Sequence, residues 1–195
     1  KKYPMDESML HDGPPTITNF SYGYSKRSMG AQIDAYNQQY NLNYQYLIPC
    51  NLYGEEDKDD ENKSHFLTSL IKKIHSSKKN KKDDITLFGD GTPLRQFMFA
   101  GDFAEIIKMT IDSGVNDSFN VATEENLSIK DMAEIALKVT NNQNIKINWD
   151  TTKPNGQFRK DVSIDKFKTL FPNFKFTPLS EGIKLVYNSY YGKIS

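Results

Sequence analysis

Hydrophobic positions along this chain fall into stretches with a helical period, separated by short apolar runs. From Ser21 to Asn41, apolar and aromatic residues recur every three to four positions without a proline, which predicts an amphipathic helix. Asp102 is expected to be the N-cap of another helix, and Ser128 with Asp131 forms a capping-box pattern that predicts the start of a third. Including these two, the further predicted helices are residues 64–77, 102–111, 128–140 and 179–190.

Short apolar runs bounded by turn residues predict strands between these helices. The predicted strands are residues 44–48, ended by Pro49, and residues 85–88, 118–121 and 145–149. Helices and strands therefore alternate along the chain, and this order predicts an α/β fold. The acidic stretch at 55–62 and the lysine run at 78–82 are interpreted as solvated segments.

Composition narrows the classes of function. Lys+Arg 25 balances Asp+Glu 25, so no net charge attracts the chain to nucleic acid or to an anionic membrane. Only Arg27, Arg95 and Arg159 carry the guanidinium group that bidentate phosphate or base recognition usually uses, which argues against a dedicated nucleic-acid binder. No apolar run approaches the roughly 18 residues of a membrane span, and the N-terminus does not resemble a signal peptide. The single cysteine, Cys50, excludes an internal disulfide framework and a multi-cysteine zinc site, so we expect a cytoplasmic globular protein and predict no metal site.

The sequence lacks the common phosphate-binding turns. Neither a G-x-G-x-x-G sequence nor a P-loop occurs in these residues, so they do not contain the turn that cradles the phosphates of a nucleotide cofactor. The chain also begins without a methionine and soon enters a Gly/Pro-rich loop at 12–15. We therefore expect that it starts within a longer protein.

Tyr22 and Lys26 stand four residues apart at the start of the first predicted helix, so their side chains share one face. An ammonium group beside a phenol lowers the phenol pKa, and such a phenol can protonate the alkoxide that forms when hydride reduces a carbonyl. The spacing alone is weak evidence, because 11 tyrosines at this lysine content give about one such pair by chance. Without further motifs, a surface Tyr/Lys pair is the alternative interpretation.

Four further motifs follow this pair in a specific order. They are "PCNLYG" at 49–54, "KSH" at 63–65, "LFGDGTPLRQF" at 87–97 and "WDTTKPNGQFRK" at 149–160. Each is polar and loop-like in a way that a hydrophobic core does not require. With the Gly-Pro-Pro loop at 13–15, their order and spacing resemble the extended short-chain dehydrogenase/reductase family, and within it the GDP-L-fucose synthases. The resemblance runs over residues 3–191 and matches only the C-terminal part of those enzymes.

This resemblance implies a fold and an activity. The implied fold is the second half of an NADP-binding Rossmann-type domain in residues 1–85, followed in residues 86–195 by mainly a smaller α/β substrate-binding domain, some segments of which return to the first. The implied activity is an NADPH-dependent 3,5-epimerase-4-reductase that converts GDP-4-keto-6-deoxy-D-mannose to GDP-L-fucose. One ketone serves both reactions, because it acidifies the neighbouring C–H bonds and then accepts the hydride.

The resemblance also assigns roles to residues. Tyr22 corresponds to the acid of the reduction, Lys26 to the residue that binds the nicotinamide ribose, and His65 to the acid of the epimerisations. The implied residues for NADP(H) binding are Lys26, Pro49, Cys50, Asn51, Leu52 and His65. The implied residues for GDP-sugar binding are Lys73, Phe88, Arg95, Asn155 and Lys160, with Arg95 facing the diphosphate. Without the resemblance, His65 is a surface residue at a helix start, Asn51 part of a strand exit and Lys73 a solvated helix residue.

Three positions depart from the family's pattern. Phe88 stands where Trp is common, so it offers no indole donor, and Asn155 stands where an acid is common. Cys50 takes a place usually held by Thr and is interpreted as a small buried residue. It is not the family's catalytic cysteine, which belongs with a catalytic serine to a segment upstream of the match.

The resemblance implies a homodimer through the Tyr22/Lys26 helix, whose apolar and aromatic stripe between Met29 and Tyr40 needs a cover. Because the Gly-rich turn and the family's catalytic Ser and Cys are missing, we expect residues 1–195 alone to be inactive. Two alternatives stay open. One is a related nucleotide-sugar epimerase or 4-reductase that acts on another sugar. The other is a non-catalytic nucleotide-sugar-binding or dimerisation fragment.

Overall fold

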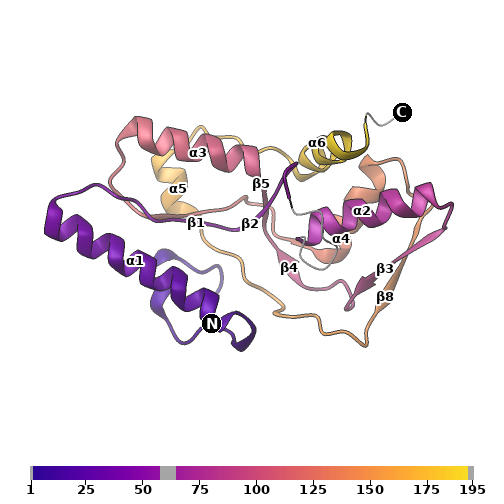
Figure 1. The fold of residues 1–195 in the computed structure, drawn as a ribbon, viewed down its shortest axis with the longest axis horizontal. Coiled ribbons are helices and arrows are strands. Elements are labelled where there is room, and N and C mark those ends of the chain that lie inside the picture. The colour runs from indigo at the N-terminus through magenta and orange to yellow at the C-terminus, as the bar shows by residue number, and fades with distance from the viewer. Residues whose placement is uncertain (1, 58–64, 193–195) are drawn as a thin grey trace.

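Two hydrophobic cores, interleaved along the sequence, organise the elements of this fold. Figure 1 shows how these elements are arranged. The computed structural model describes residues 2–57 and 65–192. The first core, here called the α3/α5 core, surrounds the buried rings of Phe119 and Phe167. It packs α3 and α5 against two strands; these elements are α3 (Ala100–Ser113), α5 (Asp165–Leu170), β1 (Leu47–Pro49) and β6 (Phe119–Val121).

The second core, the α2/α4/α6 core, lies on the other side of the molecule (Figure 1). Its fully buried members include Leu67, Ile71 and Ile183. Its elements are α2 (Phe66–Lys79), α4 (Ile129–Val139), α6 (Leu179–Tyr191), β3 (Asp84–Phe88) and β8 (Lys146–Asp150). Helix α2 precedes residue 85 in the sequence but packs in this second core. The chain therefore passes between the two cores more than once.

Among the described strands, parallel pairing dominates. β1 pairs with β6, β3 with β8, and β2 (Asn51–Tyr53) with β5 (Phe97–Phe99), each in parallel. The short strands β4 (Leu94–Arg95) and β7 (Leu127–Ser128) are antiparallel. Parallel pairs connected through helices confirm the predicted α/β class.

Strands β2 and β5 lie between the two cores and supply side chains to both. Along β5, Phe97 packs in the α2/α4/α6 core and Met98 in the α3/α5 core, because successive side chains of a strand point to opposite faces. On β2, Tyr53 and Leu52 divide in the same way. Two predicted site residues, Asn51 and Leu52, belong to β2 and so lie between the two cores.

The long helices form close to the predicted positions. Helix α1 runs from Phe20 to Tyr40 and ends at Asn41 in the left-handed conformation, with φ 53°. Helix α4 begins at the predicted capping box, where the Asp131 N–H donates to Ser128 Oγ at 3.0 Å and the Ser128 N–H donates to the Asp131 carboxylate at 3.3 Å. These reciprocal bonds satisfy two of the N–H groups that a helix start leaves unpaired.

The prediction that Asp102 caps a helix is wrong. Helix α3 begins earlier, at Ala100, and Asp102 is a buried residue of its first turn. Its carboxylate accepts the N–H of Thr177 at 2.8 Å and the hydroxyl of Thr177 at 2.7 Å. Asp102 therefore fastens α3 to the segment before α6.

The predicted strand at 44–48 begins three residues too early and ends one residue too early. β1 begins at Leu47 and includes Pro49. Side chains bind the backbone before it: the Tyr44 N–H donates to Asn37 Oδ1 at 2.9 Å and the Tyr46 N–H donates to Ser118 Oγ at 2.9 Å. These bonds replace the strand ladder that the apolar run predicted.

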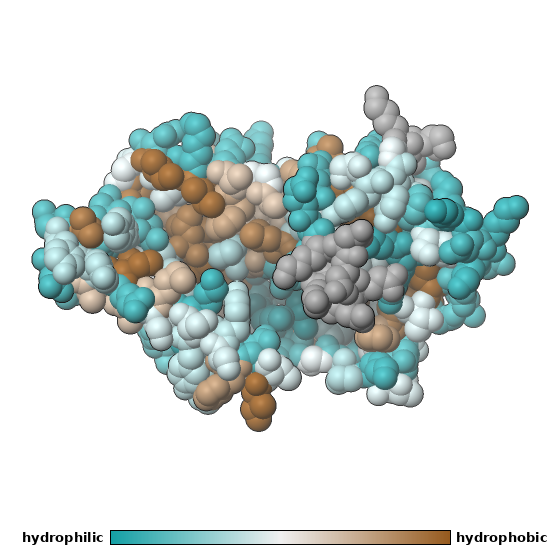
Figure 2. All heavy atoms as spheres, in the orientation of Figure 1, coloured by the Kyte–Doolittle hydropathy of each residue, from teal (hydrophilic) through white to brown (hydrophobic). Residues whose placement is uncertain are grey.

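One face of α1 is uncovered in this chain. Its apolar stripe is exposed at Met29 (44%), Tyr36 (52%) and Tyr40 (56%). Figure 2 shows hydrophobic residues gathered between α1 and α3, over β1 and β2. None of the described helices is long and apolar enough to pass through a lipid bilayer.

Candidate active site

The first turns of α1 present Tyr22 and Lys26 side by side. The Lys26 ammonium lies 5.7 Å from the centre of the Tyr22 ring, as the four-residue spacing on a helix predicts. The Tyr46 hydroxyl donates to the Lys26 carbonyl at 2.8 Å and so fixes this part of α1 to the chain before β1. Pro15 packs on the same turn, and a Cβ at Gly23 would lie 2.6 Å from the Pro15 Cβ, so this close approach requires glycine.

The segment 49–52 runs from β1 into β2. The Cys50 N–H donates to the Val121 carbonyl at 2.8 Å, and the Asn51 side-chain amide donates to the Gln96 carbonyl at 2.9 Å. Burial raises the pKa of the Cys50 thiol to about 12, so this thiol stays protonated at neutral pH. A protonated thiol is a poor nucleophile, in agreement with the interpretation of Cys50 as a small packing residue.

His65 occupies the N-cap position of α2 and is exposed. The backbone N–H of His65 donates to the Asp57 carboxylate at 3.4 Å. The other two residues of the predicted "KSH" motif, Lys63 and Ser64, lie outside the described residues.

One cavity of about 980 Å³ joins these three segments. All residues predicted for catalysis or cofactor binding line it, namely Tyr22, Lys26, Pro49, Cys50, Asn51, Leu52 and His65. One predicted substrate-binding residue, Lys160, lines it as well. The fold thus gathers residues that are distant in sequence, whereas their individual roles stay predictions.

Four predicted substrate-binding residues do not line this cavity, namely Arg95 and three residues at one end of the β3/β8 pair. The Lys73 ammonium lies 5.4 Å from the centre of the Phe88 ring, which is 65% exposed, and donates to the Thr86 carbonyl at 2.8 Å. Beyond Phe88, the Asn155 side-chain oxygen accepts the Asp90 N–H at 2.8 Å. Lys73, Phe88 and Asn155 therefore form a separate exposed patch.

Arg95 and Lys160 are neighbouring cations. Burial lowers the pKa of Arg95, and burial followed by the charge of Arg95 lowers the pKa of Lys160, although Lys160 as a whole residue is exposed. Within residues 2–57 and 65–192 neither forms an ion pair with a carboxylate; the Arg95 guanidinium donates to the Leu94 carbonyl at 2.7 Å. The adjacent Asp161 carboxylate instead accepts two bonds from Arg159, at 2.5 Å and 2.9 Å. Among the described residues, no carboxylate therefore neutralises the positive charge of this pair.

The sequence reasoning did not select Gln96, which also lines the cavity. Gln96 is 7% exposed and stands between β4 and β5. The sequence feature that could have identified Gln96 is a polar residue directly before the apolar run 97–99, within the motif that contains Arg95.

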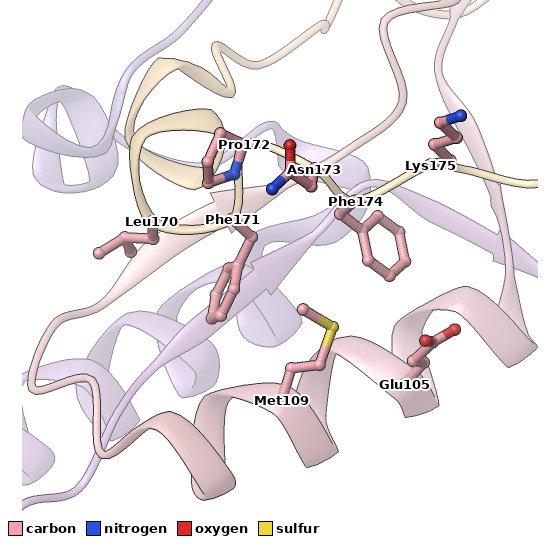
Figure 3. A pocket seen from close by; sticks show the side chains of 8 residues that line it. All are labelled: Glu105, Met109, Leu170, Phe171, Pro172, Asn173, Phe174 and Lys175. Carbon is pink, nitrogen blue, oxygen red and sulfur yellow. The ribbon is translucent and has the colours of Figure 1, made fainter.

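A second hollow, of about 520 Å³, lies between α3 and the segment 170–175 (Figure 3). Met109 and Glu105 line it from α3, and Phe171 and Phe174 from the facing segment. It contains none of the predicted site residues and does not belong to the candidate active site.

Comparisons with known proteins show the family to which the chain belongs. Residues 1–122 match the NAD dependent epimerase/dehydratase family. A GDP-L-fucose synthase of Dictyostelium discoideum is 36% identical over 185 residues, covering 93% of this chain and 57% of that protein. A probable GDP-L-fucose synthase of Drosophila melanogaster is 32% identical over 189 residues, covering 93% of this chain and 59% of that protein. The chain thus spans less than two thirds of the length of these relatives.

A solved structure gives the same result for the fold. The GDP-L-fucose synthetase of Naegleria fowleri, in a crystal structure bound to NADP, matches with a TM-score of 0.89 at 30% identity. The match covers 97% of this chain and 61% of that one. The predicted resemblance to GDP-L-fucose synthases and the predicted Rossmann-type fold are therefore confirmed.

Proposed function

Because the chain belongs to the NAD dependent epimerase/dehydratase family, we propose that it is part of an enzyme that makes GDP-L-fucose from GDP-4-keto-6-deoxy-D-mannose with NADPH. The observation that carries the proposal is the one cavity lined by Tyr22, Lys26, His65 and Lys160, with Arg95 beside Lys160. The direct test is conversion of that GDP-sugar by the full-length protein, described at the end of the Discussion.

The two cations suit the diphosphate of a nucleotide sugar. Arg95 and Lys160 lie close enough for the charge of one to lower the pKa of the other, and among the described residues no carboxylate pairs with either. An anion bound between them would relieve this repulsion and gain charge-assisted hydrogen bonds. A nucleoside diphosphate supplies such an anion.

The cavity residues supply the proton transfers. When bound, NADPH supplies the hydride that reduces C4. Tyr22 donates a proton to the C4 oxygen, and the Lys26 ammonium beside its ring stabilises the phenolate that remains. During the epimerisations, a base outside residues 1–195 removes a proton from carbon next to the ketone, and His65, at the start of α2, returns a proton to that carbon from the opposite face.

The residues present fit the nicotinamide end of NADPH. Lys26 and Asn51 bring hydrogen-bond donors to a wall that Pro49 and Leu52 make apolar. The sequence has no Gly-rich turn for the pyrophosphate, so we infer that residues 1–195 alone bind NADPH weakly and are inactive. In this proposal the α3/α5 core belongs to the cofactor-binding part and the α2/α4/α6 core to the substrate-binding part.

Replacing Arg95 with Ala in the full-length protein is expected to weaken GDP-sugar binding by about 1.5–3 kcal/mol, the range for a hydrogen bond to a charged group. Titration calorimetry with GDP measures this loss. Lys108→Ala, which removes an exposed lysine paired with Asp112 on α3, is the control and should bind GDP normally. Normal GDP affinity in Arg95→Ala would remove Arg95 from the site.

We further propose that the exposed stripe of α1 forms a homodimer interface. Tyr36→Asp places a charge at the centre of the stripe and is expected to raise the dimer dissociation constant by about tenfold or more, because a buried unpaired charge is costly. Sedimentation or light scattering over a concentration series measures this change. Gln38→Asp adds the same charge away from the stripe and should leave the dimer intact. A monomeric unsubstituted protein at high concentration would refute the interface.

A further inference from the structure

A buried side-chain amide links three segments around the candidate site. Gln96 Nε2 donates to the Thr123 carbonyl at 3.0 Å and to the Val162 carbonyl at 3.2 Å. Gln96 Oε1 accepts the Val162 N–H at 2.9 Å. The Gln96 side chain therefore satisfies both backbone groups of Val162 and one of Thr123, across separations of 66 and 27 residues.

The segment that Gln96 holds also carries Lys160. Residues 158–163, here called the strap, contain no helix or strand, so hydrogen bonds from outside set their course. At one end the Leu94 N–H donates to the Phe158 carbonyl at 2.8 Å. At the other end Met5 donates to the Asp161 carbonyl at 3.0 Å and accepts the Ser163 N–H at 2.8 Å.

Gln96 is also connected to Arg95 and to the segment 49–52 that is predicted to bind the cofactor. Arg95 precedes Gln96 directly, and the Gln96 carbonyl accepts the Asn51 side chain at 2.9 Å. One residue thus joins the backbone of Arg95, the strap with Lys160 and the Asn51 amide. Its side chain acts on the strap and on the Thr123 carbonyl, whereas its backbone acts on Asn51.

We propose that Gln96 is a positioning residue, which holds the strap so that Lys160 and Arg95 face the same diphosphate of the nucleotide sugar. This inference rests on the proposed function. The position requires an amide, because Val162 presents both a donor and an acceptor to it. A methionine of similar length would leave the Val162 N–H and carbonyl and the Thr123 carbonyl without their partner.

The test is Gln96→Met in the full-length protein, with steady-state kinetics for both substrates. The KM for the GDP-sugar should rise about tenfold, because Lys160 loses its fixed place, while the KM for NADPH should stay within about twofold, since the backbone bond to Asn51 remains. Gln143→Met makes the same change at an exposed position after α4 and should leave both values unchanged.

A double-mutant cycle separates positioning from general destabilisation. If Gln96 acts through Lys160, Gln96→Met should add little to the GDP-sugar KM of Lys160→Ala. If Gln96→Met does not fold, Gln96→Asn keeps the amide but shortens it, and should show the same non-additivity with a smaller KM rise.

The outcomes are distinguishable. Equal rises in both KM values, additive effects with Lys160→Ala, or an unchanged GDP-sugar KM would overturn the positioning role while the enzyme itself remains active. No activity on the GDP-sugar in the unsubstituted protein would overturn the proposed function and this inference together.

Discussion

Tyr22→Phe is expected to lower the rate of C4 reduction by about 10²- to 10⁴-fold, the usual contribution of a positioned general acid. The substitution removes only the hydroxyl, so the ring that lies 5.7 Å from the Lys26 ammonium stays in place. Exchange of the C3 and C5 hydrogens with solvent should continue, because enolisation next to the ketone does not use this hydroxyl.

Two measurements on one sample test this separation. NADPH oxidation reports the reduction, and mass spectrometry in deuterated water reports the exchange. Tyr24→Phe removes a hydroxyl two residues away, from a side chain that does not line the cavity, and should leave both rates unchanged. Loss of exchange together with reduction in Tyr22→Phe would show that the two roles are not separate.

His65→Gln is expected to give the opposite pattern. Epimerisation should fall by about 10²- to 10⁴-fold, since glutamine cannot carry a proton to carbon, whereas exchange through the base on the opposite face can continue. Reduction of a ketone that is already epimerised should continue. His11→Gln, an exposed histidine in the short 3-10 helix Glu7–His11, serves as the control. Normal epimerisation in His65→Gln would return His65 to its alternative interpretation as a surface residue.

The sequence predicts the long helices well and the short elements poorly. Helix α6 was predicted within one residue and α4 by its capping box, because several turns of apolar periodicity and local hydrogen bonds define them. The two- and three-residue strands β2, β4, β5 and β7 were missed, since so few residues show no alternation. Asp102 has the residue type of an N-cap, but its bonds to Thr177, 75 residues away, cannot be read from local sequence.

The candidate site also combines features that the local sequence predicts with features that depend on the tertiary fold. Tyr22 and Lys26 could be paired from their spacing, because the helix itself brings them together. That His65 and Lys160 line the same cavity depends on the tertiary fold, and only the family resemblance suggested it. Gln96 was missed because its importance lies in partners on two distant segments.

The most direct test of the central claim is the product formed from GDP-4-keto-6-deoxy-D-mannose and NADPH by the full-length protein. We predict that NADPH is oxidised in proportion to product, that the product gains two hydrogens, and that NMR identifies the sugar as L-fucose, with C3 and C5 inverted. A product that is reduced without inversion, or inverted without reduction, would favour a related 4-reductase or epimerase. Binding of GDP without any NADPH oxidation would contradict the account and favour a non-catalytic nucleotide-sugar-binding protein.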